Sequence, residues 1–305
     1  LLARTVAAAR SRQLVPAVMT FEPHPREFFA PDKAPPRVFN LRDKLMAFES
    51  HGIERVFVQH FNRRFSRLTP VEFIEDVLIA GCAARWLLVG DDFRFGAKRA
   101  GDTAFLAEYA QRGAFELEVM PTIVDAGVRV SSTAVREALG AGDLARASTL
   151  LDRAYAISGR VQHGRKLGRS LGFPTINLKI EHGHPALRGI FAVRVHGLAE
   201  RPVAGVASIG LRPTIWSPPV LRPPPAGARV ELGAARRASR VDNAGRWLLE
   251  VHLFDFADAV YGKLVTVEFV KKLRDEQKYE TLDALSAAIG DDAARARALL
   301  AADHR

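Results

Sequence analysis

Apolar and polar positions over the first half of the chain follow two alternating patterns. Short continuous apolar runs predict strands buried on both faces of a sheet, and the segments between them repeat apolar residues three and four apart, which predicts helices. Regular alternation of strand and helix favours a doubly wound α/β sheet that binds ligands at the carboxyl ends of its strands. The predicted strands cover 14–21, 55–61, 85–90 and 115–120, and the predicted helices cover 41–52, 69–82, 102–113 and 133–151.

The pattern changes beyond residue 153. Short strands separated by glycine and proline predict a small antiparallel barrel or sandwich, and a final helix is predicted over 280–302. We therefore expect two domains, an α/β domain over 1–153 and an all-β domain over 154–305. A proline- and arginine-rich stretch at 217–240 has neither period and predicts an irregular loop. The predicted strands of the second domain cover 157–164, 189–197, 202–210, 247–256 and 263–273.

Length and composition agree with two folded domains. A chain of 305 residues suits two units of roughly 100–200 residues each. Hydrophobic residues make up 48% and charged residues 26%, the balance of a soluble globular protein. The single cysteine, Cys82, leaves no partner for an internal disulfide and favours a reducing cytoplasm. No apolar run approaches the ~20 residues of a membrane helix, so we expect no membrane partner.

The net charge of +10 attracts anions, but it does not distinguish nucleotides and phosphates from nucleic acid. The arginine-rich stretch at 217–240 supports one alternative, a basic nucleic-acid-binding protein. Against it, the sequence has no helix-turn-helix, zinc or aromatic RNA-binding motif. We therefore expect no nucleic-acid partner.

A glycine-rich segment, HGRKLGRSLGFPTINL at 163–178, is the strongest chemical motif. Gly164, Gly168 and Gly172 recur every four residues with basic residues between them. Glycine lets backbone N–H groups approach a phosphate chain closely. The segment lacks the Gly-Lys-Ser/Thr of a Walker motif, and a phosphate-binding loop and a plain turn between strands both fit it.

Two polar side chains follow this loop. Pro174 keeps the chain extended, so Thr175 and Asn177 point the same way while Ile176 points to the opposite face. Hydroxyl and amide oxygens suit a Mg²⁺ ion that takes further ligands from nucleotide phosphates. The alternative is a pair of solvent-facing side chains.

A carboxylate lies on a later predicted strand, WLLEVHLFDF. Alternation places Leu249 and Val251 on the core face and Glu250 on the other. A carboxylate in this position can accept the proton of a hydroxyl that attacks a γ-phosphate. The alternative is an exposed strand glutamate.

Six motifs over about 155–285 together resemble the riboflavin kinase domain of the bacterial bifunctional riboflavin kinase/FMN adenylyltransferase family. In chain order they are GRKLGRSLGFPTINL, GIF, GVASIGLRPT, EVHLFDF, YGK and LRDEQKY. The resemblance implies ATP-dependent phosphorylation of riboflavin to FMN in a small antiparallel β-barrel. It further implies that the glycine-rich loop with Arg169 binds ATP, that Thr175 and Asn177 ligate Mg²⁺, that Glu250 is the catalytic base, and that Arg274 lies in a flap beside the flavin.

Three motifs of the first half resemble the adenylyltransferase domain of the same family, a nucleotidyltransferase-type Rossmann domain that converts FMN to FAD. They are TFEPHPREFF at 20–29, VGDDFRFG at 89–96 and RVSSTAVREAL at 129–139. By resemblance, His24, Arg129, Ser132 and Arg136 match nucleotide-binding positions. Sequence also places Arg136 in the first turn of a helix, where the dipole disfavours a cation unless a phosphate is bound.

One departure from the family pattern concerns its first strand, which ends in Gly-x-Phe-Asp-Gly-x-His-x-Gly-His. Residues 1–305 contain no such segment, so we expect the sheet to lack its first strand. We also expect adenylylation by this sequence to be slow, because losing a preorganised transition-state donor costs about 10²–10³-fold. Riboflavin kinase activity alone, or an inactive flavin-binding remnant, are further alternatives. The expected partners are ATP, riboflavin and FMN, and a homo-oligomer is left open.

Overall fold

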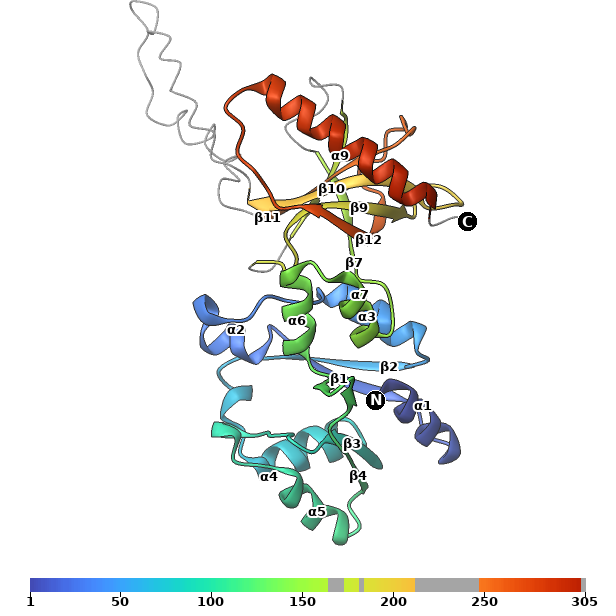
Figure 1. Cartoon of the computed structure of the whole chain (residues 1–305). Coiled ribbons are helices and arrows are strands. Elements are labelled where there is room, and N and C mark those ends of the chain that lie inside the picture. The colour runs from blue at the N-terminus through green and yellow to red at the C-terminus, as the bar shows by residue number, and fades with distance from the viewer. Residues whose placement is uncertain (164–172, 181–183, 212–246, 303–305) are drawn as a thin grey trace, which may run out of the picture. The chain divides into compact units, whose positions relative to one another are not determined.

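A computed structural model describes residues 1–163, 173–180, 184–211 and 247–302 (Figure 1). The chain divides into two compact units, Leu1–Val135 and Arg136–Arg305, and this division falls inside helix α6 (Ser132–Ala141). None of the helices in these ranges is long and apolar enough to cross a bilayer.

Two parallel strand pairs form the centre of the first unit. Strand β1 (Ala17–Glu22) pairs with β2 (Arg55–His60), and β3 (Trp86–Gly90) pairs with β4 (Glu116–Met120). Parallel pairing is what the predicted alternation of strand and helix requires, because each crossover between parallel strands needs an intervening segment. The α/β prediction is thereby confirmed. A short antiparallel hairpin follows, formed by β5 (Val124–Asp125) and β6 (Val128–Arg129).

Helices begin in this unit where a polar side chain can accept a backbone N–H of the first turn. Asn40 caps α3, Thr69 caps α4 in a capping box with Glu72, and Asp102 caps α5. The helical elements are α1 (Leu2–Ser11), α2 (Pro25–Phe29), α3 (Leu41–Ser50), α4 (Pro70–Glu72), a π-helix (Phe73–Gly81), α5 (Thr103–Gln111) and 3-10 turns at Pro31–Lys33, Phe65–Arg67 and Ala97–Arg99. A core around Ile74 and Leu106, both fully buried, packs the π-helix against α5.

An apolar cavity of about 340 Å³ interrupts the first unit. Val18 and Met19 of β1, Leu88 of β3 and Ala9 of α1 are among the residues that line it. Among the described strands, β1 pairs only with β2 and β3 only with β4, so each of these four strands keeps one unpaired edge. The continuous sheet that the alternation predicts is thus observed as two separate parallel pairs.

Six antiparallel strands close into a barrel in the second unit, in the order β10-β11-β8-β7-β12-β9. Closure decides between the barrel and the sandwich that the sequence left open. Phe191, Leu249 and Val267 are among the fully buried side chains that fill it. The strands are β7 (Ala156–Gln162), β8 (Thr175–Lys179), β9 (Gly189–His196), β10 (Val203–Leu211), β11 (Trp247–Leu253) and β12 (Leu264–Arg274).

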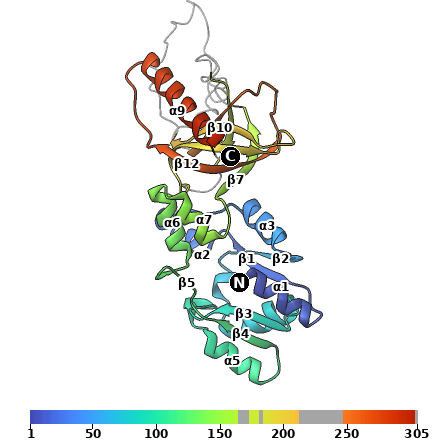
Figure 2. The ribbon, with the colours of Figure 1, turned by 45° about the vertical axis from the view of Figure 1, so that its right-hand side comes forward.

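Helix α9 (Leu282–Ala302) lies across the outside of the barrel, against β9, β10 and β12 (Figures 1 and 2). Its side chains Ala296 and Leu300 are buried in one cluster with Val206 and Leu273. This packing buries the apolar stripe of the final predicted helix and covers one side of the barrel.

The helix predicted over 133–151 is two helices, α6 and α7 (Leu144–Leu151), so that prediction is wrong. Gly142 separates them with a left-handed φ of +78°, a conformation that ends helices. Asp143 then caps α7 by accepting the N–H of Arg146 at 2.9 Å. A β-carbon at Gly142 would lie 2.2 Å from Cδ of Lys272, so a contact with strand β12 helps to fix the break.

Candidate functional site

A row of polar residues crosses three neighbouring strands of the barrel. Glu250 of β11 lies directly opposite Asn177 of β8 on one side and Ser208 of β10 on the other. Residues paired in this way point to the same face of a sheet. Leu249 and Val251, on either side of Glu250, are fully buried in the core, so the row occupies the outer face. This agrees with the alternation predicted from the sequence.

Asn177 carries an unusual acceptor. Its side chain is buried, and its Oδ1 accepts no hydrogen bond from any residue that the structure describes. Burying an amide oxygen without a partner costs about 1–3 kcal/mol, a cost that a bound cation or donor removes. A neutral, buried oxygen next to a carboxylate therefore fits a Mg²⁺ ion, a hard cation that prefers oxygen ligands.

Thr175 lies two residues before Asn177 on the same face of β8. It is half-buried and stands opposite His252 of β11. Nδ1 of His252 lies 2.9 Å from the carbonyl oxygen of Pro174, so this ring nitrogen donates its hydrogen to the carbonyl. The contact ties the strand that carries Glu250 to the start of the strand that carries Thr175 and Asn177.

A second carboxylate, Glu276, reaches the other end of the row from the loop after β12. Oγ of Ser208 donates to Oε1 of Glu276 at 3.3 Å. A β-carbon at Gly210 would lie 1.8 Å from Oε1 of Glu276, so in this arrangement the carboxyl occupies the space that a side chain on β10 would need. Glu276 is exposed as a residue, but its carboxyl group is partly desolvated, and this desolvation, together with the nearby charge of Glu250, raises the pKa of Glu276.

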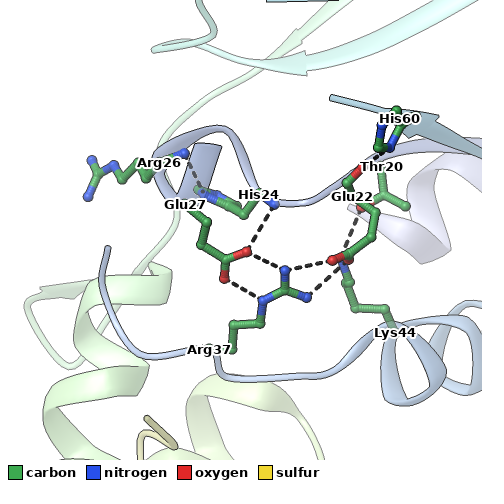
Figure 3. A network of polar contacts seen from close by, with 8 residues as sticks. All are labelled: Thr20, Glu22, His24, Arg26, Glu27, Arg37, Lys44 and His60. Atoms are coloured by element: carbon green, nitrogen blue, oxygen red, sulfur yellow. Dashed lines mark hydrogen bonds and ion pairs between the residues drawn. The ribbon is translucent and has the colours of Figure 1, made fainter. Parts of the chain in front are cut away.

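A second group of polar residues lies at the carboxyl end of β1 in the first unit (Figure 3). His24 is the N-cap of α2, and its Nδ1 accepts the backbone N–H of Arg26 at 3.2 Å. The backbone N–H of His24 in turn donates to Oε2 of Glu27 at 3.3 Å. This reciprocal capping box fixes the turn that carries the histidine.

Arg37 holds the two carboxylates beside His24 (Figure 3). Its Nη1 and Nη2 donate to the two oxygens of Glu22 at 3.0 and 2.6 Å, and its Nε and Nη2 donate to the carboxylate of Glu27. Nζ of Lys44 lies 3.6 Å from Glu22, and burial lowers the pKa of this ammonium group. Two anions and two cations thus form a half-buried network next to His24.

The loop after β3 contacts strand β6 through an ion pair and the segment after β4 through a hydrogen bond. Nη2 of Arg129 donates to Oδ2 of Asp92 at 2.5 Å, and Asp91 accepts the backbone N–H of Thr122 at 3.0 Å. Both aspartates directly follow Gly90, the last residue of β3. Arg129 is thereby held at the carboxyl end of a parallel strand, the edge where this class of sheet binds ligands.

Comparison with known proteins decides between the functions that the sequence left open. The FAD synthetase family model matches residues 1–134, and the riboflavin kinase family model matches residues 151–300. The bifunctional riboflavin kinase/FMN adenylyltransferase of Escherichia coli (strain K12) is 43% identical over 288 residues, which cover 94% of this chain and 83% of that protein. The chain belongs to the bifunctional riboflavin kinase/FMN adenylyltransferase family.

A second enzyme and a solved structure are also similar to this chain. The Pseudomonas fluorescens enzyme of the same name is 40% identical over 301 residues, which cover 99% of this chain and 88% of that protein. A solved structure described as a macrolide-efflux protein from Streptococcus pneumoniae superimposes with a TM-score of 0.70 at 25% identity, and the match covers 95% of this chain and 86% of that one. The fold of this chain is therefore similar to that of a solved structure over almost its whole length.

The resemblance inferred from the motifs is confirmed for both halves of the chain. An FAD synthetase domain is followed by a riboflavin kinase domain, and the chain is an enzyme of FMN and FAD synthesis. Neither the matched families nor the relatives support a nucleic-acid-binding protein or an inactive remnant.

Several predicted site residues of the riboflavin kinase domain lie outside the described part of the chain. The same holds for the proline- and arginine-rich stretch 217–240. Their assignments stay predictions from the sequence. The site residues concerned are Gly164, Gly168, Arg169 and Gly172.

Arg274, predicted beside the flavin, is engaged by helix α9. Its Nε and Nη2 donate to the carboxylate of Asp292 at 2.9 and 2.6 Å, and Asp292 is only 3% exposed. The guanidinium carbon also lies 5.8 Å from the ring centre of Tyr279. Through these contacts Arg274 links β12 to α9. The predicted contact of Arg274 with the flavin stays a prediction.

The nucleotide-binding positions of the FAD synthetase domain fall at the start of α6 and before it. Ser131 caps this helix by accepting the N–H of Ala134 at 3.2 Å, so Ser132 is the first helical residue. Arg136 is the fifth residue of α6, so it lies just beyond the first turn in which the sequence placed it, and that prediction is wrong. Arg136 belongs to the second compact unit, whereas His24 and Arg129 belong to the first. Sequence reasoning missed two residues next to the sites, Arg37 and Glu276. Glu276 lay within the LRDEQKY motif, and Arg37 gave no signal of its own.

Proposed function

We propose that the riboflavin kinase domain transfers the γ-phosphate of ATP to the 5′-hydroxyl of riboflavin, with Glu250 as the general base and Thr175 and Asn177 as ligands of Mg²⁺. The pairing of β11 with β8 carries this proposal, because it sets Glu250 directly opposite Asn177 on one face. The buried Oδ1 of Asn177, which lacks a hydrogen bond within the described residues, supports a cation at this position.

The proposed reaction needs a proton acceptor next to the attacking oxygen. Glu250 accepts the proton of the riboflavin hydroxyl as that oxygen approaches the γ-phosphate, and a positioned base of this kind contributes about 10²–10⁴-fold. When bound, Mg²⁺ offsets the negative charge that develops on the transferred group. Thr175 and Asn177 lie on β8, the strand next to the one that carries Glu250. A Mg²⁺–ATP complex bound by their oxygens would therefore lie close to the base, which helps to hold the two substrates in the geometry for reaction.

Transfer of isotopic label tests the reaction itself. We expect the chain, incubated with riboflavin, Mg²⁺ and ATP labelled in the γ-phosphate, to yield FMN that carries the label. The same incubation with an excess of a chelator should yield none. FMN formed at full rate without divalent cation, or label that reaches only water, would contradict the proposal.

We also propose that the first domain adenylylates FMN with ATP, and that His24, Arg129, Ser132 and Arg136 contact the nucleotide. The match of the FAD synthetase family to residues 1–134 supports the activity. The positions of His24 after β1 and of Arg129 beside the end of β3 support the site. Formation of FAD from FMN and Mg-ATP tests the activity, and FAD formation at the wild-type rate in Arg129→Gln would contradict the role of Arg129.

The domain limits and the setting of the enzyme belong to the same proposal. We place the domain boundary between residues 153 and 154, in the short connection that follows α7 (Leu144–Leu151) and precedes β7 (Ala156–Gln162). Limited proteolysis that cuts there and leaves two stable fragments would support this limit. The single cysteine supports a reducing cytoplasm. We propose that the partners are the small-molecule substrates ATP, riboflavin and FMN, with no nucleic acid.

A further inference from the structure

The half-buried network beside His24 contains more charge than a simple turn needs. Arg37 is 12% exposed, and the side chains of Glu22 and Glu27 are 22% and 20% exposed. Taking such charges out of water costs free energy that their mutual attraction repays only when the geometry is good. An arrangement of this kind is weak evidence for stability alone, and it points to a requirement for a fixed geometry.

The network reaches the backbone of His24, and the turn that it holds contacts one atom of the His24 ring. The guanidinium of Arg37 donates to Glu27, and Glu27 accepts the backbone N–H of His24 at 3.3 Å. Nδ1 of His24 accepts the N–H of Arg26 at 3.2 Å, so the neutral ring carries its hydrogen on Nε2. The contacts of the ring's own turn therefore select one tautomer of the histidine.

We propose that Arg37 is a positioning residue for His24: it grips Glu22 and Glu27 together and, through Glu27, fixes the orientation and the tautomer of the ring at the carboxyl end of β1. The proposal rests on the nucleotide-binding role proposed for His24. Glu22 is the last residue of β1, so the grip of Arg37 on it anchors the turn to the strand. Lys44 of α3 adds a second positive charge to the network, with its Nζ 3.6 Å from the carboxylate of Glu22.

Arg26, on the helix α2 that His24 caps, provides a matched control. Arg26 is exposed, and its side chain points away from the network in Figure 3. Arg26→Gln removes one positive charge near His24, as Arg37→Gln does, but it leaves the backbone N–H of residue 26 that His24 accepts. A difference between the two variants therefore reports the grip of Arg37 and not the loss of one positive charge.

Nitrogen NMR of the full chain labelled in its histidines reads the tautomer directly, with the His24 signal assigned by its loss in His24→Gln. In the wild type and in Arg26→Gln we expect the hydrogen on Nε2. In Arg37→Gln we expect a mixture of the two tautomers. An unchanged His24 signal in Arg37→Gln would overturn the proposal.

A second variant keeps the test decisive if Arg37→Gln does not fold. Glu27→Ala cuts the link between Arg37 and His24 and leaves the contact of Arg37 with Glu22, so we expect the same mixture of tautomers. An unchanged His24 signal in Glu27→Ala alone would overturn the proposal. Where Arg37→Gln folds, adding it to Glu27→Ala should change the His24 signal no further. If the two effects add, the path through Glu27 is wrong.

Titration with Mg-ATP separates this proposal from the proposed function. In the wild type the His24 signal should shift with added Mg-ATP, and Arg37→Gln should need about 10-fold more nucleotide for the same shift, the size of effect that is usual when a residue that orients a ligand-binding side chain is lost. A wild-type His24 signal that ignores Mg-ATP would contradict the nucleotide role of His24. The tautomer measurement would still decide whether Arg37 positions the ring.

Discussion

Glu250 of β11 and Asn177 of β8 are directly opposed in the barrel, and the pair combines a carboxylate with a buried amide oxygen that accepts no hydrogen bond from the described residues. The two groups suit different tasks. A carboxylate can take a proton from an alcohol, and a neutral oxygen can ligate a hard cation without losing one. Because Glu250 and Asn177 are paired on adjacent strands, the proton acceptor and the cation ligand lie side by side on the barrel.

The amide of Asn177 should matter for the cation and not for folding. Asn177→Leu keeps the branching of the side chain at Cγ and removes an acceptor that makes no hydrogen bond to the described part of the chain. We expect the denaturation midpoint to stay the same or rise, because a buried acceptor without a partner is destabilising. The Mg²⁺ concentration for half-maximal FMN formation should rise by about 10-fold or more. A fall in stability with unchanged Mg²⁺ dependence would assign Asn177 a purely structural role.

The ion pair between Arg274 and Asp292 should stabilise the second domain. Asp292→Asn leaves a largely buried guanidinium without its countercharge, and breaking buried pairs in this way costs about 3–5 kcal/mol. Asp255→Asn is the matched control, since Asp255 pairs with Arg297 of the same helix α9 but is largely exposed. Urea unfolding of both variants measures the difference. Equal effects would show that burial does not distinguish the two pairs.

Glu276 should make the stability of the second domain depend on pH. Its folded-state pKa is raised above the ordinary glutamate value of 4.5, so the stabilisation is present below that value and is lost as the pH rises through the raised pKa. Glu276→Gln cannot titrate, and its stability relative to the wild type should therefore improve as the pH rises across this window. Urea midpoints measured well below and well above pH 4.5 test the sign. A difference that stays constant with pH would contradict the raised pKa.

Two glycines near the end of α6 should respond in opposite directions to alanine. Gly142 has a φ of +78° and no room beside Lys272, so Gly142→Ala should destabilise the chain by about 1 kcal/mol or more. Gly140 lies inside α6 with open space around its Cα, so Gly140→Ala should stabilise it by about 0.5–1 kcal/mol. Thermal unfolding of the two variants compares them. Destabilisation by both variants would contradict the prediction, because it would show that alanine is unfavourable inside α6 as well as at the break.

Local patterns predicted the elements of this fold closely. The strand predicted over 115–120 is β4 (Glu116–Met120), and the strand predicted over 263–273 is β12 (Leu264–Arg274). Apolar runs and alternation are local properties, and they survive in the folded chain because each strand buries the face that its own residues define. The outward position of Glu250 followed from alternation alone.

Features that depend on contacts between distant segments were not predictable in this way. The break at Gly142 involves Lys272, which is 130 positions further along the chain. The partner of Arg274 could have been any acidic residue, and the structure shows that it is Asp292. Arg37 reaches Glu22 and Glu27 from a loop without a recognisable motif. Charge pairing has no sequence period, so only coordinates reveal which carboxylate each arginine contacts.

The most direct test of the account is the rate of phosphoryl transfer in Glu250→Gln. We expect single-turnover formation of FMN from riboflavin and Mg-ATP to fall by about 10²–10⁴-fold, with nucleotide affinity unchanged, since only a proton acceptor is removed. Glu280→Gln, an exposed glutamate of the same domain, should react at the wild-type rate. A wild-type rate in Glu250→Gln would contradict the role of Glu250 as the base.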